Sequence, residues 1–419
     1  MRTIEPLKEP LHKEITVPGD KSISHRAIML ASISDKIVEI KNFLTGADCL
    51  STIECMKALG VEIERTGSRV LVKGRGLNGL SEPKDILNAG NSGTTLRLLT
   101  GLLSGQNFLT TFTGDESLRR RPMDRIIKPL TKMGAAIAGR RDKYLPLTIL
   151  PKGNLQGIEY KMPVASAQVK SAILLAGLYA TGKTTVIEPA TCRDHTEKML
   201  RGFGVAIEKS GNAITLSPPR RLDAPNTIEI PGDISSAAYW IVLATCLDGS
   251  EVLIKNVGIN ETRTGIIDVM RQMGGRIELI NKRTSGGEPL ADLKVTSSKL
   301  HGVEIGGEMI PRLIDEIPII AVAAAFAEGT TTISGVEELR VKESDRLAAI
   351  VEEYNKVTTG YEATDDTLKI FGGHKWRRAQ CKTRGDHRLA MSLAVMGMLA
   401  EGVTLDNTDC IKISYPNFL

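Results

Sequence analysis

The sequence repeats itself with a period of about 70 residues, and this period limits the folds open to the chain. Four short segments read alike, each with a glycine between a helical pattern and a short strand. They are LGVEI (59–63), MGAAI (133–137), FGVAI (203–207) and MGGRI (273–277), and their junction glycines lie 74, 70 and 70 residues apart. Glycine ends many helices, and a fixed period marks repeated structural units. We therefore predict one helix-to-strand junction per repeat.

A second type of helix, rich in small apolar residues, alternates with the first. We expect it to begin near six positions that are 67 to 82 residues apart: Lys21, Asn91, Ser166, Asp233, Asp315 and Asp386. β-branched segments such as VEIKNF (38–43) and TTVIEP (184–189) follow most of these helices. Alternating helices and strands indicate an α/β fold with layered packing.

The tripeptide PGD divides the repeats into two sets. It occurs at residues 18–20 and again at 231–233, and each copy precedes three repeats. We predict two domains, one formed by residues 19–232 and the other by residues 1–18 with 233–419. The chain would cross between them at both PGD segments. Two crossings side by side would make a hinge, and the cleft that the hinge closes is where we expect the active site.

Composition excludes several classes of protein. Hydrophobic residues make up 42% and charged residues 25%, and the longest apolar run, 317–327, is too short to span a membrane. The N-terminus lacks a signal-peptide pattern, and the six cysteines do not cluster with histidines as metal ligands do. We therefore expect a cytoplasmic protein without a metal. The net charge of +5 suits small anions, whereas 4% aromatic residues argue against nucleic acid.

Cations stand where helix physics disfavours them. VPGDKSISHRAIMLAS (17–32) places Lys21 and Arg26 at the start of a predicted helix. The partial positive charge of a helix N-terminus makes such cations unfavourable unless an anion binds there. The alternative is that Ser22 is an ordinary N-cap and that the cations are solvated. This segment alone favours neither interpretation.

The densest group of charges is RVKESDR, residues 340–346. On a helix, Lys342 and Arg346 would share one face, so two cations would converge unless an anion lay between them. Glu343 and Asp345 could instead neutralise them, which is the usual outcome for a mixed charge run. Because arginine and lysine recur at corresponding positions of the repeats, the set as a whole indicates a surface that binds anions.

Eight segments occur in an order that resembles one known family. They are PGDKSISHR, GNSGTTLR, RRRPM, ASAQVKSA, CRDHTEK, IDE, LRVKESDR and GDHRLAMS. Together they resemble the 5-enolpyruvylshikimate-3-phosphate (EPSP) synthase family, most closely its class II bacterial branch, over about residues 14–417. The resemblance implies two inverse α/β barrel-like domains, each of three βαβαββ repeats, joined by a two-strand hinge. It also implies a cytoplasmic monomer that needs no cofactor.

The resemblance implies a reaction and a set of site residues. Enzymes of the family transfer the enolpyruvyl group of phosphoenolpyruvate to the 5-hydroxyl of shikimate 3-phosphate and release phosphate. By similarity, shikimate 3-phosphate would be bound by Lys21, Ser22, Arg26, Ser166, Ala167, Gln168, Arg193, Asp315 and Lys342. Phosphoenolpyruvate would be bound by Lys21, Asn91, Gly93, Arg121, Gln168, Arg346 and Arg388. The inhibitor glyphosate is expected to compete with phosphoenolpyruvate beside Gly93.

Catalysis requires a base for the hydroxyl and an acid for the methylene carbon of phosphoenolpyruvate. By resemblance, Asp315 would be the base, Glu343 the acid, and Lys21 would stabilise developing charge. Cations around Glu343 should lower its pKa, which disfavours the acid role.

The sequence departs from the family at Ala167, which replaces a serine of the other class. Lys412 sits one residue from a lysine of that class, so its role stays open.

Residues 354–382 match the family poorly, and we expect them to form a surface hairpin.

Other interpretations of the function compete with this one. A related enzyme acts on UDP-N-acetylglucosamine, but its loop cysteine has no counterpart in DESLRRRPMDR (115–125). A non-catalytic anion-binding protein is disfavoured by the presence of both Asp315 and Glu343. We expect small-molecule substrates, and neither nucleic acid nor membrane as a partner.

Overall fold

The computed structural model describes residues 1–151 and 153–419, which form two compact units. Unit 1 comprises Met1–Pro18, Gly232–Arg283 and Pro289–Leu419. Unit 2 comprises Gly19–Pro231 and Thr284–Glu288. Each unit has a hydrophobic core of its own. The sequence prediction assigned residues 284–288 to the other domain; they group with unit 2 because the carboxylate of Glu288 lies 2.9 Å from Nδ1 of buried His195.

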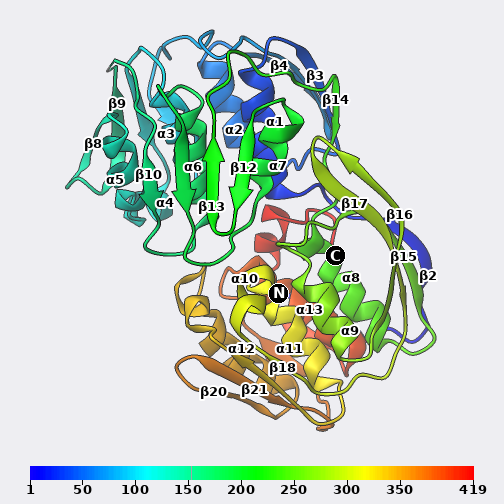
Figure 1. The fold of residues 1–419 in the computed structure, drawn as a ribbon. Coiled ribbons are helices and arrows are strands. Elements are labelled where there is room, and N and C mark those ends of the chain that lie inside the picture. Colours follow the sequence, from blue (N-terminus) through cyan, green and yellow to red (C-terminus); the bar gives the residue numbers. More distant parts are fainter. Residues whose placement is uncertain (152) are drawn as a thin grey trace. The chain divides into compact units, whose positions relative to one another are not determined.

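Unit 2 contains three sheets of the same design (Figure 1). In each, a short outer strand runs parallel to its neighbour, and an antiparallel hairpin completes the sheet. The first sheet has the order β14 (Thr227–Glu229), β3 (Ile37–Lys41), β5 (Arg69–Lys73), β4 (Glu62–Thr66). The second has the order β6 (Leu87–Asn88), β7 (Thr110–Thr113), β9 (Tyr144–Leu150), β8 (Ala136–Arg140). The third has the order β10 (Glu159–Lys161), β11 (Thr184–Ile187), β13 (Ala213–Leu216), β12 (Ile207–Ser210).

Unit 1 repeats this design. Its sheets have the orders β2 (His12–Thr16), β15 (Glu251–Gly258), β17 (Glu288–Thr296), β16 (Arg276–Ser285), and β18 (Glu304–Ile305), β19 (Thr330–Ser334), β21 (Thr367–Phe371), β20 (Tyr361–Ala363). The remaining sheet has three strands, β1 (Arg2–Ile4), β23 (Val403–Leu405) and β22 (Ala379–Cys381). Because β2 runs parallel to β15, the N-terminal segment completes a sheet of unit 1.

Six helices rich in small apolar residues form the interior of the units. They are α1 (Lys21–Ser32), α3 (Gly93–Leu103), α6 (Ala167–Gly177), α8 (Ile234–Cys246), α11 (Ile317–Ala325) and α13 (His387–Leu399). Each begins within two residues of its predicted position, and every residue of α11 is buried. Small side chains let these helices approach one another closely; a Cβ on Gly101 of α3 would lie 2.2 Å from the carbonyl oxygen of Ala172 in α6.

The other helices cover the sheets or connect the repeats. They are α2 (Ala47–Ala58), α4 (Glu116–Arg120), α5 (Asp124–Lys132), α7 (His195–Gly202), α9 (Gly265–Gln272), α10 (Ile310–Leu313) and α12 (Arg346–Val357), with 3₁₀ turns at Gly307–Met309, Glu337–Val341 and Asp409–Ile413. The predicted junction glycines, Gly60, Gly134, Gly204 and Gly274, have φ between 77° and 102°. Their left-handed conformation confirms the predicted helix ends.

The PGD tripeptides combine a close approach with a helix cap. A Cβ on Gly19 would lie 1.9 Å from the carbonyl oxygen of Asn42, so only glycine fits there. Asp20 Oδ1 accepts a hydrogen bond from Ile23 N (2.9 Å), which makes Asp20, rather than Ser22, the N-cap of α1. Asp233 caps α8 in the same way.

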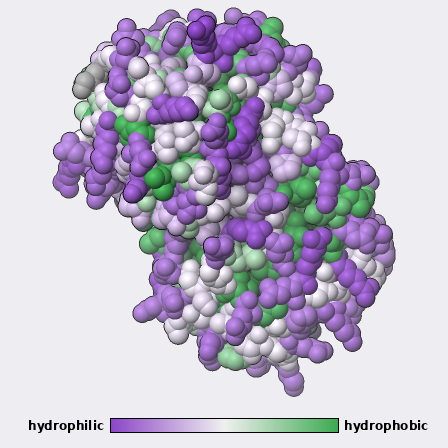
Figure 2. All heavy atoms as spheres, in the orientation of Figure 1, coloured by the Kyte–Doolittle hydropathy of each residue, from purple (hydrophilic) through white to green (hydrophobic). Residues whose placement is uncertain are grey.

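Residues 354–382 are more than the surface hairpin that the sequence predicted. Strands β20 and β21 do pair as an antiparallel hairpin. However, this hairpin forms one side of a four-stranded sheet, and Tyr361, Leu368 and Ile370 are buried. The face drawn in Figure 2 is mainly hydrophilic, with smaller hydrophobic patches. Within the described part of the chain, no helix has the length and hydropathy needed to cross a membrane.

Candidate active site

Unit 2 fixes one arginine firmly at the start of α1. Arg26 is 5% exposed, and its Nε donates to Thr196 Oγ1 and its Nη2 to Ser171 Oγ, both at 2.7 Å. Its Nη1 donates to the carbonyl oxygen of Ser22 (2.9 Å). Burial lowers the pKa of Arg26 to about 10, and the positive charge of Arg193 also acts to lower it. Two predicted binding arginines are therefore close enough to repel each other, which an anion would relieve.

Lys21, the first residue of α1, has a carboxylate partner that the sequence did not reveal. Its ammonium group forms an ion pair with Asp48 of α2, and 31% of its side chain is exposed. The pair holds Lys21 in place and leaves part of its side chain accessible. The Thr95 hydroxyl of α3 donates a hydrogen bond to the carbonyl oxygen of Asp48 in α2, 47 positions earlier in the sequence, and this bond ties the two helices together.

Arginines also converge at the start of α3. Ser92 caps this helix, and a Cβ on Gly93 would lie 3.0 Å from Arg97 Nη1 and 3.6 Å from Arg121 Nη1. Burial, together with Arg121 and Arg125, lowers the pKa of Arg97 to about 10. Cations at these distances repel one another, so the arrangement favours a bound anion. The sequence prediction omitted Arg97 from the site, although it belongs to GNSGTTLR.

The start of α6 joins the same group. Ser166 caps α6 by accepting a hydrogen bond from Val169 N (3.4 Å), and Ala167 is the first helical residue. Gln168 Oε1 accepts from Arg97 Nη1 (2.5 Å), and Gln168 Nε2 donates to Thr94 Oγ1 (3.0 Å). The amide of Gln168 thus links α3 to α6. Asn91 is exposed in the turn before α3.

A buried ion triad lies beside the Arg26 contacts. Lys170 Nζ is 2.6 Å from Glu188 Oε1 and 2.6 Å from Glu197 Oε1, and the three side chains are at most 4% exposed. Lys170 and Glu197 are the sequence neighbours of Ser171 and Thr196, which hold Arg26. The triad therefore joins α6 to α7 at the place where both helices contact the arginine.

Unit 1 carries the second group of predicted residues. Arg346 has no exposed side-chain surface; its Nε donates to Asp386 Oδ2 (2.8 Å), its Nη2 to Glu343 Oε2 (2.5 Å) and its Nη1 to Asp315 Oδ1 (3.4 Å). Arg388 Nη2 lies 3.7 Å from Asp315 Oδ2. Asp315 thus stands between two arginines, one at the start of α12 and one at the start of α13.

The charges of unit 1 shift the pKa of their neighbours. Burial acts to raise the pKa of Glu343 and of Asp386, but Arg346 outweighs it and both lie below their ordinary values. This confirms the expected lowering for Glu343. Burial and Arg388 lower the pKa of His387 to about 3, so its imidazole is neutral near pH 7.

One expectation about a lysine is wrong, and the structure gives a partner for another lysine whose role the sequence left open. Lys342 and Arg346 do not share a helix face, because α12 begins at Arg346 and Lys342 has an extended backbone. Lys342 Nζ instead lies 3.3 Å from Glu338 Oε1. Lys412 pairs with Asp409 (3.0 Å) and is 70% exposed, so it contacts neither group of predicted residues.

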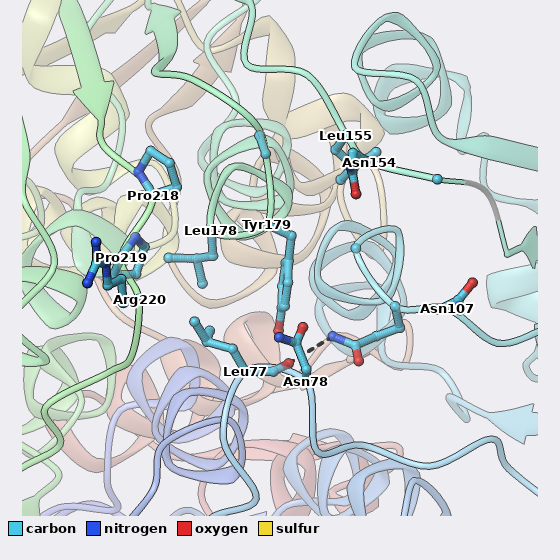
Figure 3. Close-up of a pocket in the computed structure, with 14 residues that line it drawn as sticks. Leu77, Asn78, Asn107, Asn154, Leu155, Leu178, Tyr179, Pro218, Pro219 and Arg220 are labelled. Carbon is cyan, nitrogen blue, oxygen red and sulfur yellow. Dashed lines mark hydrogen bonds between the residues drawn. The ribbon is translucent and has the colours of Figure 1, made fainter.

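A separate hollow in unit 2 contains none of the predicted residues (Figure 3). Its volume is about 660 Å³, and its lining includes the Tyr179 ring and the side chains of Asn78, Asn107 and Asn154. Among the lining residues that the structure describes, only Arg220 is charged. We place the candidate active site at the arginine groups, because several cations converge there and suit dianionic substrates better than one exposed arginine. The described residues contain no group of three or more His, Cys, Asp or Glu placed to hold a metal ion.

Comparison of the sequence with known proteins identifies its family. The family profile for EPSP synthase (3-phosphoshikimate 1-carboxyvinyltransferase) matches residues 7–419. A 3-phosphoshikimate 1-carboxyvinyltransferase of Thermoanaerobacter sp. (strain X514) is 55% identical over 406 residues, covering 96% of this chain and 95% of that protein. One from Bacillus cereus (strain B4264) is 50% identical over 421 residues, with coverage of 100% and 97%.

Solved structures agree with the sequence comparison. An EPSP synthase structure from Acinetobacter baumannii has a TM-score of 0.94 at 41% identity and covers 99% of this chain and 96% of its own. The enolpyruvyl transferase NikO from Streptomyces tendae, at 18% identity and a TM-score of 0.79, shares the fold. The chain therefore belongs to the EPSP synthase (3-phosphoshikimate 1-carboxyvinyltransferase) family and is a carboxyvinyl transferase.

Proposed function

We propose that the chain transfers the enolpyruvyl group of phosphoenolpyruvate to the 5-hydroxyl of shikimate 3-phosphate and releases phosphate, as a step of the shikimate pathway. The names of its relatives support this substrate pair. The observation that carries the proposal is the position of Asp315 between Arg346 and Arg388, because a potential base then stands among groups that bind anions.

We assign shikimate 3-phosphate chiefly to unit 2. Arg26 is fixed by three hydrogen bonds to groups of α1, α6 and α7, and Arg193 adds a second positive charge. A phosphate dianion would relieve their repulsion with charge-assisted hydrogen bonds. The remaining ligands on this side would be Ser22, Ser166, Ala167 and Gln168, with Lys21 reaching both substrates. Asp315 and Lys342 of unit 1 would complete the set.

We assign phosphoenolpyruvate to arginines of both units. In unit 2 the proposed ligands are Lys21, Asn91, Gly93, Arg121 and Gln168, and the Arg97 guanidinium supports this group. In unit 1 they are Arg346 and Arg388. We propose that the two units act together, with the PGD segments as the hinge. Arg346 must loosen its contact with Glu343 to meet a substrate, since it has no exposed surface.

The proposed chemistry proceeds by addition and elimination. Asp315 accepts the proton of the 5-hydroxyl as that oxygen attacks C2 of phosphoenolpyruvate, while C3 gains a proton. Elimination then removes a proton from C3 and expels phosphate. Lys21 and the arginines would stabilise the charges that develop. Glu343 remains the proposed donor to C3, but Arg346 favours its ionised form, so it must first take up a proton.

We further propose that the enzyme is a cytoplasmic monomer and that glyphosate competes with phosphoenolpyruvate. The six cysteines are free thiols, five of them buried, which suits a reducing compartment. Glyphosate carries a carboxylate and a phosphonate, so the same arginines can bind it. Gly93 leaves space beside Arg97 and Arg121 for such a ligand.

Phosphate release tests the proposal directly. Purified protein mixed with shikimate 3-phosphate and phosphoenolpyruvate should release one phosphate per enolpyruvyl product, and neither substrate alone should release any. UDP-N-acetylglucosamine in place of shikimate 3-phosphate is the matched control. Release with the nucleotide sugar but not with shikimate 3-phosphate would overturn the proposed substrate.

A further inference from the structure

A buried carboxylate next to the proposed base has no role in the mechanism above. Glu316 follows Asp315 directly and is 1% exposed. Its Oε1 accepts a hydrogen bond from the hydroxyl of Ser235 in α8 and lies 3.8 Å from Arg388 Nη1. Its Oε2 is buried, and no described residue forms a hydrogen bond with it. Glu316 is the N-cap residue of α11, but its side chain forms no capping hydrogen bond, so capping does not explain the position of the carboxyl group.

A second buried arginine fixes this arrangement. Arg263 is 3% exposed, and its Nη2 donates to Ser235 Oγ (2.7 Å) and to Asp233 Oδ1 (3.3 Å). Ser235 therefore accepts from Arg263 and donates to Glu316, which orients the carboxyl group of Glu316. The same Arg263 nitrogen is 4.0 Å from Glu316 Oε1. The contacts come from α8, from the segment before α9 and from the start of α11.

Arg388 stands between two carboxyl groups as a result. Asp315 Oδ2 is 3.7 Å from its Nη2, and Glu316 Oε1 is 3.8 Å from its Nη1. If both groups were ionised, they would weaken the positive field that Arg388 presents to an anionic substrate. Burial raises the pKa of Glu316, and the adjacent charge of Asp315 raises it further, although Arg263 and Arg388 oppose this. The group is thus biased toward the neutral acid.

We propose that Glu316 is a positioning residue for the binding of phosphoenolpyruvate: its carboxyl group, held by the Ser235 hydroxyl, orients the Arg388 guanidinium. This inference rests on the proposed function, in which Arg388 binds phosphoenolpyruvate. It assigns Glu316 no contact with either substrate. Asp315, on the other side of Arg388, keeps its proposed role as the base.

The proposal makes pH a diagnostic variable. The charged or titratable groups that face Glu316 are Asp315, Arg263, Arg388 and Tyr239 of α8, with Asp233 behind Arg263. As pH rises through the raised pKa of Glu316, the group ionises, and Arg388 loses net positive charge toward the substrate. The KM for phosphoenolpyruvate should therefore increase with pH in the natural protein. The Glu316→Gln variant should lack the increase that comes from ionisation of Glu316.

The test compares Glu316→Gln, Glu316→Ala and the natural protein, with the exposed Glu308→Ala as a matched control. We expect Glu316→Gln to keep KM and kcat within about twofold near neutral pH and to flatten the pH dependence of KM. We expect Glu316→Ala to raise the KM for phosphoenolpyruvate about tenfold, with a much smaller change in kcat, because Arg388 loses its orientation. Glu308→Ala should resemble the natural protein.

Two outcomes would overturn the inference. One is a Glu316→Ala variant whose KM for phosphoenolpyruvate is unchanged although its melting temperature falls, as a purely structural role predicts. The other is a Glu316→Gln variant with the same pH dependence of KM as the natural protein, and this outcome decides the case if the alanine variant does not fold. The natural protein in the same assay keeps the proposed function separate: if it is active and both variants match it, only the role of Glu316 fails.

Discussion

Lys170→Met should destabilise unit 2 strongly. The substitution keeps the length and apolar character of the side chain but removes the charge between Glu188 and Glu197. Both carboxylates are at least 96% buried, so neither can reach water when its partner is lost. Breaking a buried ion pair in this way costs about 3–5 kcal/mol. A typical domain has a free energy of unfolding of about 5–15 kcal/mol, so the loss would be a large fraction of the total.

The expected loss of stability comes from the uncompensated negative charge on Glu188 and Glu197, and a further variant can test this cause. A triple variant with Lys170→Met, Glu188→Gln and Glu197→Gln carries no buried charge at the triad and should recover part of the lost stability. Lys36→Met is the matched control, because the Lys36–Asp223 pair is exposed at 45% and 70%. Screening by solvent makes such pairs weak, so this variant should unfold like the natural protein.

Urea denaturation can follow the units separately. Both tryptophans, Trp240 and Trp376, belong to unit 1, so tryptophan fluorescence reports on that unit, whereas circular dichroism reports on both. We expect Lys170→Met to shift the circular dichroism transition to lower urea by more than any shift seen in fluorescence. The KM for shikimate 3-phosphate should also rise, because α6 and α7 hold Arg26. A variant that unfolds at the same urea concentration as Lys36→Met would refute the reasoning.

Three further predictions concern the site residues. Asp315→Asn should bind both substrates but turn over at least about a hundredfold more slowly, since the proposed base is lost. Single-turnover rates and substrate affinities measure the two effects separately. A rate near that of the natural protein would show that Asp315 is not the base. Gly93→Ala should fold normally and weaken glyphosate inhibition, because its methyl group would lie 3.0 Å from Arg97 Nη1; inhibition curves at fixed phosphoenolpyruvate decide this, and an unchanged inhibition constant would place glyphosate elsewhere. Asp386 has a lowered pKa, so its pair with Arg346 stabilises the fold above the ordinary pKa and loses this effect as pH falls through the lowered one. Asp386→Asn should therefore melt at lower temperature than the natural protein near pH 7, with a gap that narrows below about pH 3.9, and a gap independent of pH would contradict the assignment.

The repeat could be predicted because its signals are local. A glycine at a helix end needs only its own left-handed backbone, and Gly60 and Gly274 show it, with φ of 88° and 101°. A run of small apolar residues such as 317–325 also indicates a buried helix without knowledge of its neighbours. The same reasoning located the start of α13 beside Arg388.

Features set by distant contacts could not be predicted. The RVKESDR segment looks helical by its charge spacing, yet Lys342 is extended and α12 begins only at Arg346, whose guanidinium is held by Asp386, 40 positions away. Glu316 follows Asp315 in the sequence and could be taken for a helix-start carboxylate. Its contacts with Ser235 and Arg263 span 81 and 53 positions, and no local pattern signals them. Asp48 escaped notice for the same reason.

The tip of the β16–β17 hairpin limits how the protein can be dissected. Gly286 and Gly287, with φ of 55° and 88°, turn the chain tightly, and a Cβ on Gly287 would lie 2.3 Å from the carbonyl oxygen of Lys198. Ser285 Oγ accepts from Glu229 N, and Glu288 meets His195. A recombinant fragment of residues 19–231 would therefore expose a buried histidine and remove the Ser285 hydroxyl that accepts the hydrogen bond of Glu229 N in β14. To keep all the residues of unit 2, such a fragment must also include the five residues of the hairpin tip, which the gene encodes far downstream.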